Sequence, residues 1–340
     1  MVKLSILIPV YNAEKHIGKL LDCILEQMLD GIEVILLNDG SQDSSEMICA
    51  EYATRHSKQI RLISRENQGV VYTRRELFNA SKGEWIWIID ADDVISDNSL
   101  AVIMDTISKY VSHDMVMFDY FYADGENRTI VHQLPFKDND FFSGDRKNLV
   151  YKELVSGHIL NSLWSKVFKR ECIDFMSDYS EYRNVNKAND LLQLLPIVTN
   201  AKSILYKRIP LYTYYYNVSG NLTHVFQDST YISLSRVWMR LKEYIVKWGM
   251  WNELQDMFYQ QAANRVVELL KYYVWSGHTC QKYFALLEKV MNDDVFSDAL
   301  QHCDCSCFKW KDGLFVRLIR CNAKHTSFTL LAIQQKIRRG

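Results

Sequence analysis

Short apolar runs alternate with segments of helical periodicity over the first third of the chain. Four runs have strand length and are rich in β-branched or aromatic residues: LSILIPV (4–10), EVILLND (33–39), IRLIS (60–64) and WIWII (85–89). Between them, the apolar spacing and the N-cap residues predict helices over about 17–28, 44–56 and 70–81. Strands that alternate with helices at short intervals predict an α/β fold, in which helices cover both faces of a mainly parallel sheet.

The pattern changes after about residue 110. MVMFDYFYAD (115–124) and SILYKRIPLYTYYYN (203–217) have the composition of strands, and the second carries tyrosines at alternate positions. Residues 125–160 are polar and irregular, which is typical of a loop that closes over a substrate. From about Val225 the periodicity is helical. The expected division is one domain over 1–224, with halves 1–110 and 111–224, followed by a C-terminal helical region over 225–340.

Each of the four predicted strands in the first third ends in a polar signature. The signatures are Tyr11-Asn12, Asn38-Asp39-Gly40-Ser41, Asn67-Gln68-Gly69 and Asp90-Ala91-Asp92-Asp93. In open parallel sheets, ligands bind outside the carboxyl ends of the strands. We therefore expect the four segments to converge on one binding site.

Asp90 and Asp92 form a D-x-D pair directly after a buried strand. Two carboxylates at this spacing can hold a divalent cation against a diphosphate, because hard oxygen ligands suit Mg²⁺ or Mn²⁺. The alternative is that Asp92, Asp93 and Asp97 cap the helix that begins near Asp97. Capping accounts for one carboxylate and leaves the others unexplained, since close carboxylates repel unless a cation or a proton relieves them.

Two common nucleotide-binding motifs are missing from the sequence. It has no P-loop, and the turn PVYNAEKH after the first strand lacks the G-x-G-x-x-G of a dinucleotide site. Asp39 is placed to accept the N3 hydrogen of a pyrimidine, and Tyr11 to offer its ring to the base. Each residue also has an ordinary interpretation, as a turn residue and as a half-buried aromatic.

Composition sets broad limits on the class of protein. The chain has 340 residues and a formal net charge of −1, so no global charge predicts nucleic-acid binding. It lacks the roughly 18 uninterrupted apolar residues of a spanning helix and the flanks of a signal peptide, which predicts a cytoplasmic protein. The eight cysteines fit a reducing compartment. A zinc site at His302, Cys303, Cys305 and Cys307 is an alternative that the spacing disfavours.

The C-terminal stretch 309–339 is strongly basic. It contains eight Lys or Arg residues and one acidic residue, Asp312, with the apolar runs FVRLIR and FTLLAI among them. Such a segment can contact the anionic inner face of a membrane, or it can be an ordinary solvated helix. The sequence leaves both interpretations open.

Four ordered motifs resemble the nucleotide-binding half of family-two glycosyltransferases of GT-A fold. They are ILIPVYNAEKHIGKLLDCILEQ, EVILLNDGSQDSS, NQGVVYTRR and GEWIWIIDADD, and together they cover roughly residues 3–110. A weaker resemblance continues through LWSKVFKRE (163–171) and through residues 187–224. The family transfers a sugar from a metal-bound nucleotide sugar with inversion at the anomeric carbon.

The resemblance implies a role for individual positions. The implied nucleotide-sugar-binding residues are Pro9, Tyr11, Asn12, Glu14, Asp39, Gly40, Ser41, Asn67, Gly69, Arg74, Asp90, Ala91, Asp92 and Asp93. Asp90 would lie near the ribose and Asp92 on Mn²⁺ or Mg²⁺, with His224 as a weaker metal candidate. Trp164 and Lys166 match the acceptor-side aromatic-x-Lys segment, and Asp190 matches the catalytic base.

The chain departs from the family pattern at three positions. Asn189 replaces the usual Glu before the base, and Thr73 and Arg75 replace the usual Ala and Asn around Arg74. An alternative role for Asp190 is to cap the N-terminus of the apolar helix that follows it.

These departures leave three functional hypotheses. The first is inverting transfer from a nucleotide sugar, UDP-linked by preference, to a glycan or lipid-linked acceptor in cell-surface polysaccharide biosynthesis. The second is a noncatalytic sugar-nucleotide-binding or scaffolding subunit. A nucleotidyltransferase is the third, and the missing Gly-rich triphosphate loop counts against it.

Overall fold

The computed structural model describes residues 2–125, 127–132, 135–157, 159–183, 185–216 and 229–339. The chain divides into two compact units, the first built from 1–153 and 158–223 and the second from 154–157 and 224–340.

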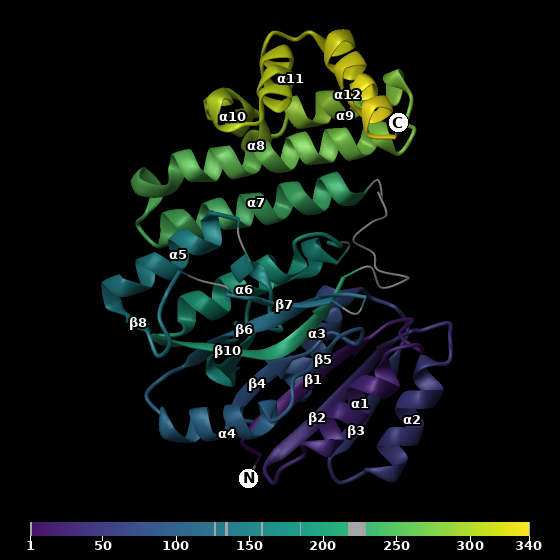
Figure 1. Ribbon diagram of the computed structural model, residues 1–340, viewed down its shortest axis with the longest axis vertical. Helices are drawn as coiled ribbons and strands as arrows, with labels where there is room; N and C mark the ends of the chain where they lie inside the picture. The colour runs from purple at the N-terminus through teal and green to yellow at the C-terminus, as the bar shows by residue number, and fades with distance from the viewer. Residues whose placement is uncertain are drawn as a thin grey trace. The chain divides into compact units, whose positions relative to one another are not determined.

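One ten-stranded sheet forms the centre of the first unit (Figure 1). Across the sheet the order is β3 (Ile60–Arg65), β2 (Ile32–Asp39), β1 (Leu4–Val10), β4 (Trp85–Ile88), β9 (Lys166–Lys169), β6 (Met115–Asp124), β10 (Ser203–Tyr215) and β5 (Val94–Ile95). Strands β1 to β4 pair in parallel, and so do β6 and β10. The antiparallel β9 joins these two groups through β4 and β6.

Helices cover both faces of this sheet, because its central strands are apolar on both sides. Leu4, Ile6 and Ile8 of β1 share one core cluster with the buried residues of α1 (Ile17–Glu26), α2 (Ser45–Arg55) and α4 (Ser99–Lys109). The opposite face carries α3 (Val70–Ala80), which packs on β1 and β2, with α6 (Asn189–Asn200) beside it. The predicted α/β fold with helices on both faces is therefore confirmed. The sheet is mixed, with parallel pairing among β1 to β4 and between β6 and β10 and antiparallel pairing elsewhere.

The prediction of an irregular loop over 125–160 is wrong. Strand β7 (Asn127–Val131) forms a hairpin with β6, β8 (Phe141–Ser143) pairs with β10, and α5 (Lys147–Val155) follows. Most residues of β7 are exposed. The polar composition of this stretch reflects a solvent-facing edge rather than missing secondary structure.

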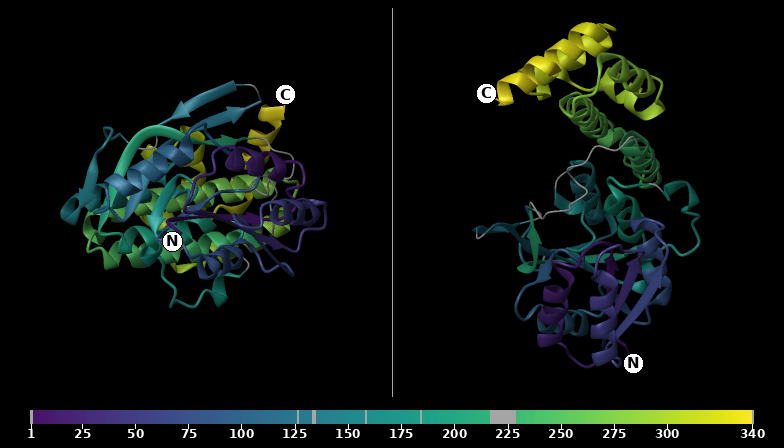
Figure 2. Two further views of the ribbon diagram at one scale, coloured as in Figure 1. Left: turned by 90° about the horizontal axis from the view of Figure 1, so that it is seen from below. Right: turned by 90° about the vertical axis from the view of Figure 1, so that its right-hand side faces the viewer.

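Short 3₁₀ turns complete the first unit, and helices make up the described part of the second. The turns are η1 (Gly144–Arg146), η2 (Ile159–Asn161), η3 (Arg170–Cys172) and η4 (Ser180–Tyr182). The second unit contains α7 (Ser229–Lys247), α8 (Trp251–Trp275), α9 (Cys280–Met291), α10 (Asp294–His302), η6 (Cys305–Cys307), α11 (Trp310–Arg320) and α12 (Lys324–Arg339). Helices α7 and α8 form an antiparallel pair, and α9 to α12 pack on α8 (Figures 1 and 2). Among the described residues, no helix has the length and apolar character needed to cross a membrane.

Gly83 allows β4 to begin directly beside β1, which gives a stability test. A Cβ at Gly83 would lie 2.6 Å from both the backbone nitrogen and Oγ of Ser5. Gly83→Ala should therefore lower the free energy of unfolding by about 1–3 kcal/mol, because the backbone would have to move to relieve the overlap. Gly18→Ala is the matched control, since its Cβ would meet only the Tyr52 hydroxyl at 3.9 Å. Urea denaturation measures both variants, and a Gly83→Ala midpoint equal to that of wild type would contradict this packing.

Candidate active site

The carboxyl ends of the parallel strands bring the first two polar segments together. The backbone N–H of Asn12 donates to Ser41 Oγ at 3.0 Å, and the Asn12 side chain accepts from the Gln42 N–H at 2.8 Å. Glu14 reaches the same turn, where its carboxylate accepts from the Ser44 N–H at 3.0 Å. The segment that starts at Pro9 is thus fastened to the turn after β2.

Asp39 joins the second polar segment to the third. It is 3% exposed, and its two oxygens accept from the backbone N–H groups of Gln68 and Gly69, each at 2.9 Å. Gly40 lets the two turns approach, because a Cβ there would lie 2.8 Å from the Asn67 nitrogen. Asn67 and Tyr11 remain exposed. Asp39 therefore has a structural task in addition to the base recognition that the sequence predicts for it.

The aspartates after β4 form a tight turn in which Asp93 N–H donates to Asp90 C=O at 3.2 Å. Asp93 is buried, and its carboxylate accepts from the Tyr212 hydroxyl at 2.7 Å and from the Tyr215 N–H at 2.9 Å. The N-cap of α4 is Asn98, which makes no side-chain capping bond. The helix-capping alternative for these aspartates is not supported.

Asp92 is the carboxylate of this turn for which no hydrogen bond or ion pair to another residue is found in the described part of the chain. Burial raises the pKa of Asp92, and burial with the charges of Asp92 and Asp90 raises that of Asp93 well above its usual value. Asp90 is 28% exposed, yet the protein around it excludes enough water to raise its pKa as well, against the effect of Arg74. Such crowded carboxylates suit a divalent cation, with Asp92 and Asp90 as oxygen ligands. No three His, Cys, Asp or Glu side chains within the described ranges form a complete metal site, so a diphosphate would have to supply further ligands.

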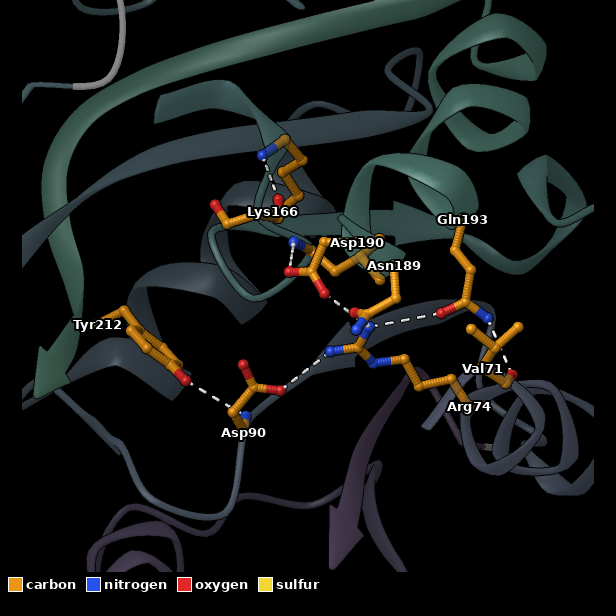
Figure 3. A network of polar contacts seen from close by, with 10 residues as sticks. Val71, Arg74, Asp90, Lys166, Asn189, Asp190, Gln193 and Tyr212 are labelled. Atoms are coloured by element: carbon orange, nitrogen blue, oxygen red, sulfur yellow. Dashed lines mark hydrogen bonds and ion pairs between the residues drawn. The ribbon is translucent and has the colours of Figure 1, made fainter. Parts of the chain in front are cut away.

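Arg74 lies at the centre of the site, between the D-x-D turn and α6 (Figure 3). It is 3% exposed, and its Nη2 lies 3.2 Å from Asp90 Oδ1 while its Nη1 lies 2.6 Å from Asp190 Oδ1. Burial alone would lower the pKa of Arg74, but the two carboxylates together raise it. The resemblance implies that Arg74 lies beside the nucleobase and the diphosphate of the donor. In this structure its guanidinium is bonded to the carboxylates of Asp90 and Asp190.

Asp190 lies in the first turn of α6 without capping it. The N-cap is Ala188 at φ +55°, and it makes no side-chain capping bond. The Asp190 carboxylate, 24% exposed, accepts from Arg74 on Oδ1 and from the Leu163 N–H on Oδ2 at 3.2 Å. Asn189 also accepts from Arg74, at 3.0 Å. The Asn at the position of the usual Glu thus orients the same guanidinium as the acid beside it.

The two predicted acceptor-side residues differ in their surroundings. Trp164 stacks on Tyr212, with ring centroids 4.5 Å apart and an interplanar angle of 12°. Lys166 is completely buried and donates to the Ser162 carbonyl oxygen at 2.5 Å. Of the two, Trp164 is the one that packs on Tyr212, whose hydroxyl contacts the D-x-D turn. His224 lies outside the described residues.

Several residues of the site are not identified by the sequence analysis. Tyr212 bonds to Asp93 and accepts from the Asp90 N–H at 3.2 Å, although 122 residues separate it from Asp90. Gln193 bridges Arg74 and the Val71 carbonyl oxygen, at 3.5 and 3.1 Å. Its position three residues after Asp190 on a helix was an available signal. Tyr212 belongs to the run of alternating tyrosines, but that pattern predicts a strand and not a place in the site.

The described side chains of the cysteine-rich segment are not grouped as metal ligands. His302 bonds to the Asp298 carbonyl oxygen, Cys303 is buried against Leu300, and the Cys307 thiol donates to Asp304.

A family model and two relatives place these residues among known proteins. The model for Glycosyl transferase family 2 matches residues 5–169. The chain is 31% identical over 172 residues to the minor teichoic acid biosynthesis protein GgaB of Bacillus subtilis, covering 50% of this chain and 18% of that protein. It is 28% identical over 220 residues to the putative glycosyltransferase EpsH of the same organism, covering 64% of this chain and 61% of that protein. The chain thus spans less than two thirds of the length of both relatives.

The fold matches that of a solved protein structure. The structure of Staphylococcus aureus TarS 1–349 in complex with UDP-GlcNAc superposes with a TM-score of 0.64 at 15% identity, over 98% of this chain and 92% of that one. At this identity the match shows the fold alone. The family model and the curated glycosyltransferase relative support one assignment: residues 5–169 form a glycosyl transferase family 2 domain.

Proposed function

We propose that this protein is a metal-dependent inverting glycosyltransferase that uses a UDP-sugar and extends a glycan or lipid-linked saccharide of a cell-surface polysaccharide. The observation that carries the proposal is the Arg74 bridge, which holds Asp90 of the D-x-D and Asp190 of α6 on one guanidinium. A transferase needs a donor-binding carboxylate and an acceptor-side base close together. The bridge supports that pairing.

The carboxyl edge of the sheet has the side chains expected to bind a nucleotide-sugar donor. The exposed Tyr11 ring offers a stacking face for a nucleobase. Among the described residues, the Asp92 carboxylate makes no hydrogen bond or ion pair to another residue, so it is free to bind a cation. Bound Mn²⁺ or Mg²⁺ on Asp92 and Asp90 would neutralise the charge of the departing diphosphate. The preference for UDP is supported by the UDP-GlcNAc bound in the TarS structure, whose fold this chain shares.

Asp190 is proposed as the base that takes the proton of the acceptor hydroxyl. Inverting transfer needs such a carboxylate on the side of the sugar opposite the leaving group. Arg74 donates to one carboxylate oxygen and the Leu163 N–H to the other, which fixes the orientation of the carboxylate plane. With 24% of the side chain exposed, an acceptor can reach it.

The proposed acceptor class is supported by the name of one relative and not by the geometry. GgaB is described by its name as a teichoic acid biosynthesis protein. A glycan or lipid-linked acceptor is consistent with that relative.

Substitution of the two proposed functional carboxylates separates their roles. Asp190→Asn should lower turnover at least 100-fold and leave UDP-sugar binding unchanged, because the amide cannot take a proton. Asp92→Asn should weaken both metal-dependent binding and turnover. The measurement is UDP release from a panel of UDP-, GDP- and dTDP-sugars with Mn²⁺ or Mg²⁺, next to donor binding by calorimetry. Asp97→Asn, on an exposed residue of the same segment, is the matched control and should behave as wild type.

The scaffold hypothesis predicts a different result for the same variants. Metal-dependent donor binding without turnover on any glycan or lipid-linked acceptor would favour a noncatalytic subunit. Absence of binding would contradict the assignment of Asp90 and Asp92.

We also propose that the basic stretch 309–339 contacts an anionic membrane through one face of α11. Trp310, Leu314 and Arg317 recur at helical spacing on that face and are exposed, with Trp310 at 73%. We call these three residues the α11 face. The stretch has eight basic residues and one acidic residue, which is a charge of +7. The rest of the chain carries −8, which gives the net charge of −1. The acid, Asp312, is paired with Lys271. An exposed tryptophan and leucine beside basic side chains are typical of helices that lie in a membrane interface.

Vesicle binding tests this surface. The full chain should co-sediment with vesicles of phosphatidylcholine and phosphatidylglycerol, and less with phosphatidylcholine alone. Arg317→Gln should weaken binding about fivefold, since a basic residue near an anionic surface contributes about 1 kcal/mol. Trp310→Ser should weaken it by at least as much. Met47→Ser, at an apolar residue that is 68% exposed on α2, is the control. Equal binding of wild type and the α11-face variants would contradict this part of the proposal.

A further inference from the structure

Lys166 is a buried lysine without an ion-pair partner among the described residues. Its side chain has no exposed surface, and its Nζ donates to the Ser162 carbonyl oxygen at 2.5 Å and to Ser165 Oγ at 2.9 Å. Burial lowers the pKa of Lys166 to about 7, while the charge of Asp190 acts in the opposite direction. Lysine is almost never fully buried, because its ammonium loses hydration there. The buried position therefore calls for a specific role.

The ammonium completes a turn in which every carbonyl oxygen has a partner. The acceptors and donors are Ser162 O with Lys166 Nζ, Leu163 O with Lys166 N, Trp164 O with Trp87 Nε1, and Ser165 O with Phe118 N. Ser162 Oγ and Ser165 Oγ also share a hydrogen bond of 2.7 Å. Three of these bonds come from backbone groups or from the Trp87 side chain on the sheet. Only the Ser162 carbonyl depends on a side-chain charge.

One peptide group connects Lys166 to the proposed base. The Ser162 carbonyl and the Leu163 N–H belong to the same planar unit. Lys166 bonds to its oxygen, and its N–H donates to Asp190 Oδ2 at 3.2 Å. A cation on the carbonyl end polarises the peptide and strengthens donation from the other end. The labelled side chains of Lys166 and Asp190 lie on the two sides of this turn in Figure 3.

We propose that Lys166 is a positioning residue for Asp190, which holds the Ser162–Leu163 peptide group so that its N–H stays on Oδ2 of the base. The inference rests on the proposed function, because it takes Asp190 as the acceptor of the hydroxyl proton. Arg74 holds Oδ1 from the other side. With both oxygens fixed, the carboxylate keeps one orientation toward the acceptor.

The proposal has a pH signature with a definite sign. The charged groups around this turn are Lys166 on β9 and Asp190 on α6, with Arg74 of α3 beyond the carboxylate. Lys166 is a full ammonium donor below its pKa of about 7 and a neutral amine above it. Its support of Asp190 is therefore present at lower pH and declines as the pH rises through about 7.

Lys166→Met keeps an unbranched side chain that is one atom shorter and removes the charge. We expect kcat to fall roughly 10- to 100-fold, the effect of losing a charged hydrogen bond. The KM for the donor should stay within about threefold of wild type, because Lys166 lies in the protein interior and not on the donor edge. The decline of kcat through neutral pH should disappear. Lys166→Arg keeps a permanent charge, so it should recover part of the activity without that decline. Lys169→Met is the control on the same strand, where Lys169 pairs with Asp114 at 3.0 Å, and should behave as wild type.

Hydrogen exchange tests the link without turnover. The Leu163 amide should exchange faster in Lys166→Met than in wild type or in Lys169→Met, measured by mass spectrometry on the free protein. If wild type turns over, Asp190→Asn is inactive, and Lys166→Met has an unchanged kcat and pH profile, the inference is overturned while the proposed function stands. If no donor turns over, the proposed function fails. Faster exchange would then still support the Lys166–Leu163 link, and unchanged exchange would overturn it.

Discussion

A buried guanidinium between two carboxylates determines the architecture of the site. Arg74 of α3 pairs with Asp90 after β4 and with Asp190 on α6. A buried charge is tolerated only with partners, and removal of one partner of such a group costs about 3–5 kcal/mol. The turn after β4 and α6 must therefore keep their positions relative to α3. This requirement places the D-x-D turn and the proposed base next to each other.

A second set of polar contacts fixes the other side of the same turn. Asp93 accepts from the side chain of Tyr212 and from the backbone of Tyr215, which ties β10 to the D-x-D segment. Trp164 stacks on Tyr212 and is followed closely by the buried Lys166. Asp90, Asp93 and Asp190 are thus all bound to protein groups. Asp92 is the carboxylate of the turn that makes no hydrogen bond or ion pair to another described residue, and its role as a metal ligand stays a prediction.

The sequence predicted the first half of the fold well, because its signals are local. Strand β1 (4–10), strand β6 (115–124) and helix α3 (70–80) lie within one residue of the predicted ranges. The hairpin and helix inside 125–160 were missed, because an exposed edge strand such as β7 has the polar composition of a loop. Local pattern carried no information there.

The site was predictable where residues follow a strand end and not where distant segments meet. Asp90 and Asp92 could be identified from one short run, and Asp190 from the resemblance. Tyr212 and the Leu163 N–H could not be identified, since a backbone donor leaves no sequence signature and Tyr212 reaches the site across the sheet. The partners of Arg74 likewise depend on the docking of α6 against α3.

Binding of the donor beside the Arg74 bridge can be tested most directly by a crystal structure of the complex. A crystal structure with UDP and Mn²⁺ should show the cation on Asp92, with Arg74 still bonded to both Asp90 and Asp190. Such a result would leave Asp190 next to the donor, as a base requires. A UDP bound away from the D-x-D turn, or an Arg74 that leaves Asp190 to bind the diphosphate, would contradict the account.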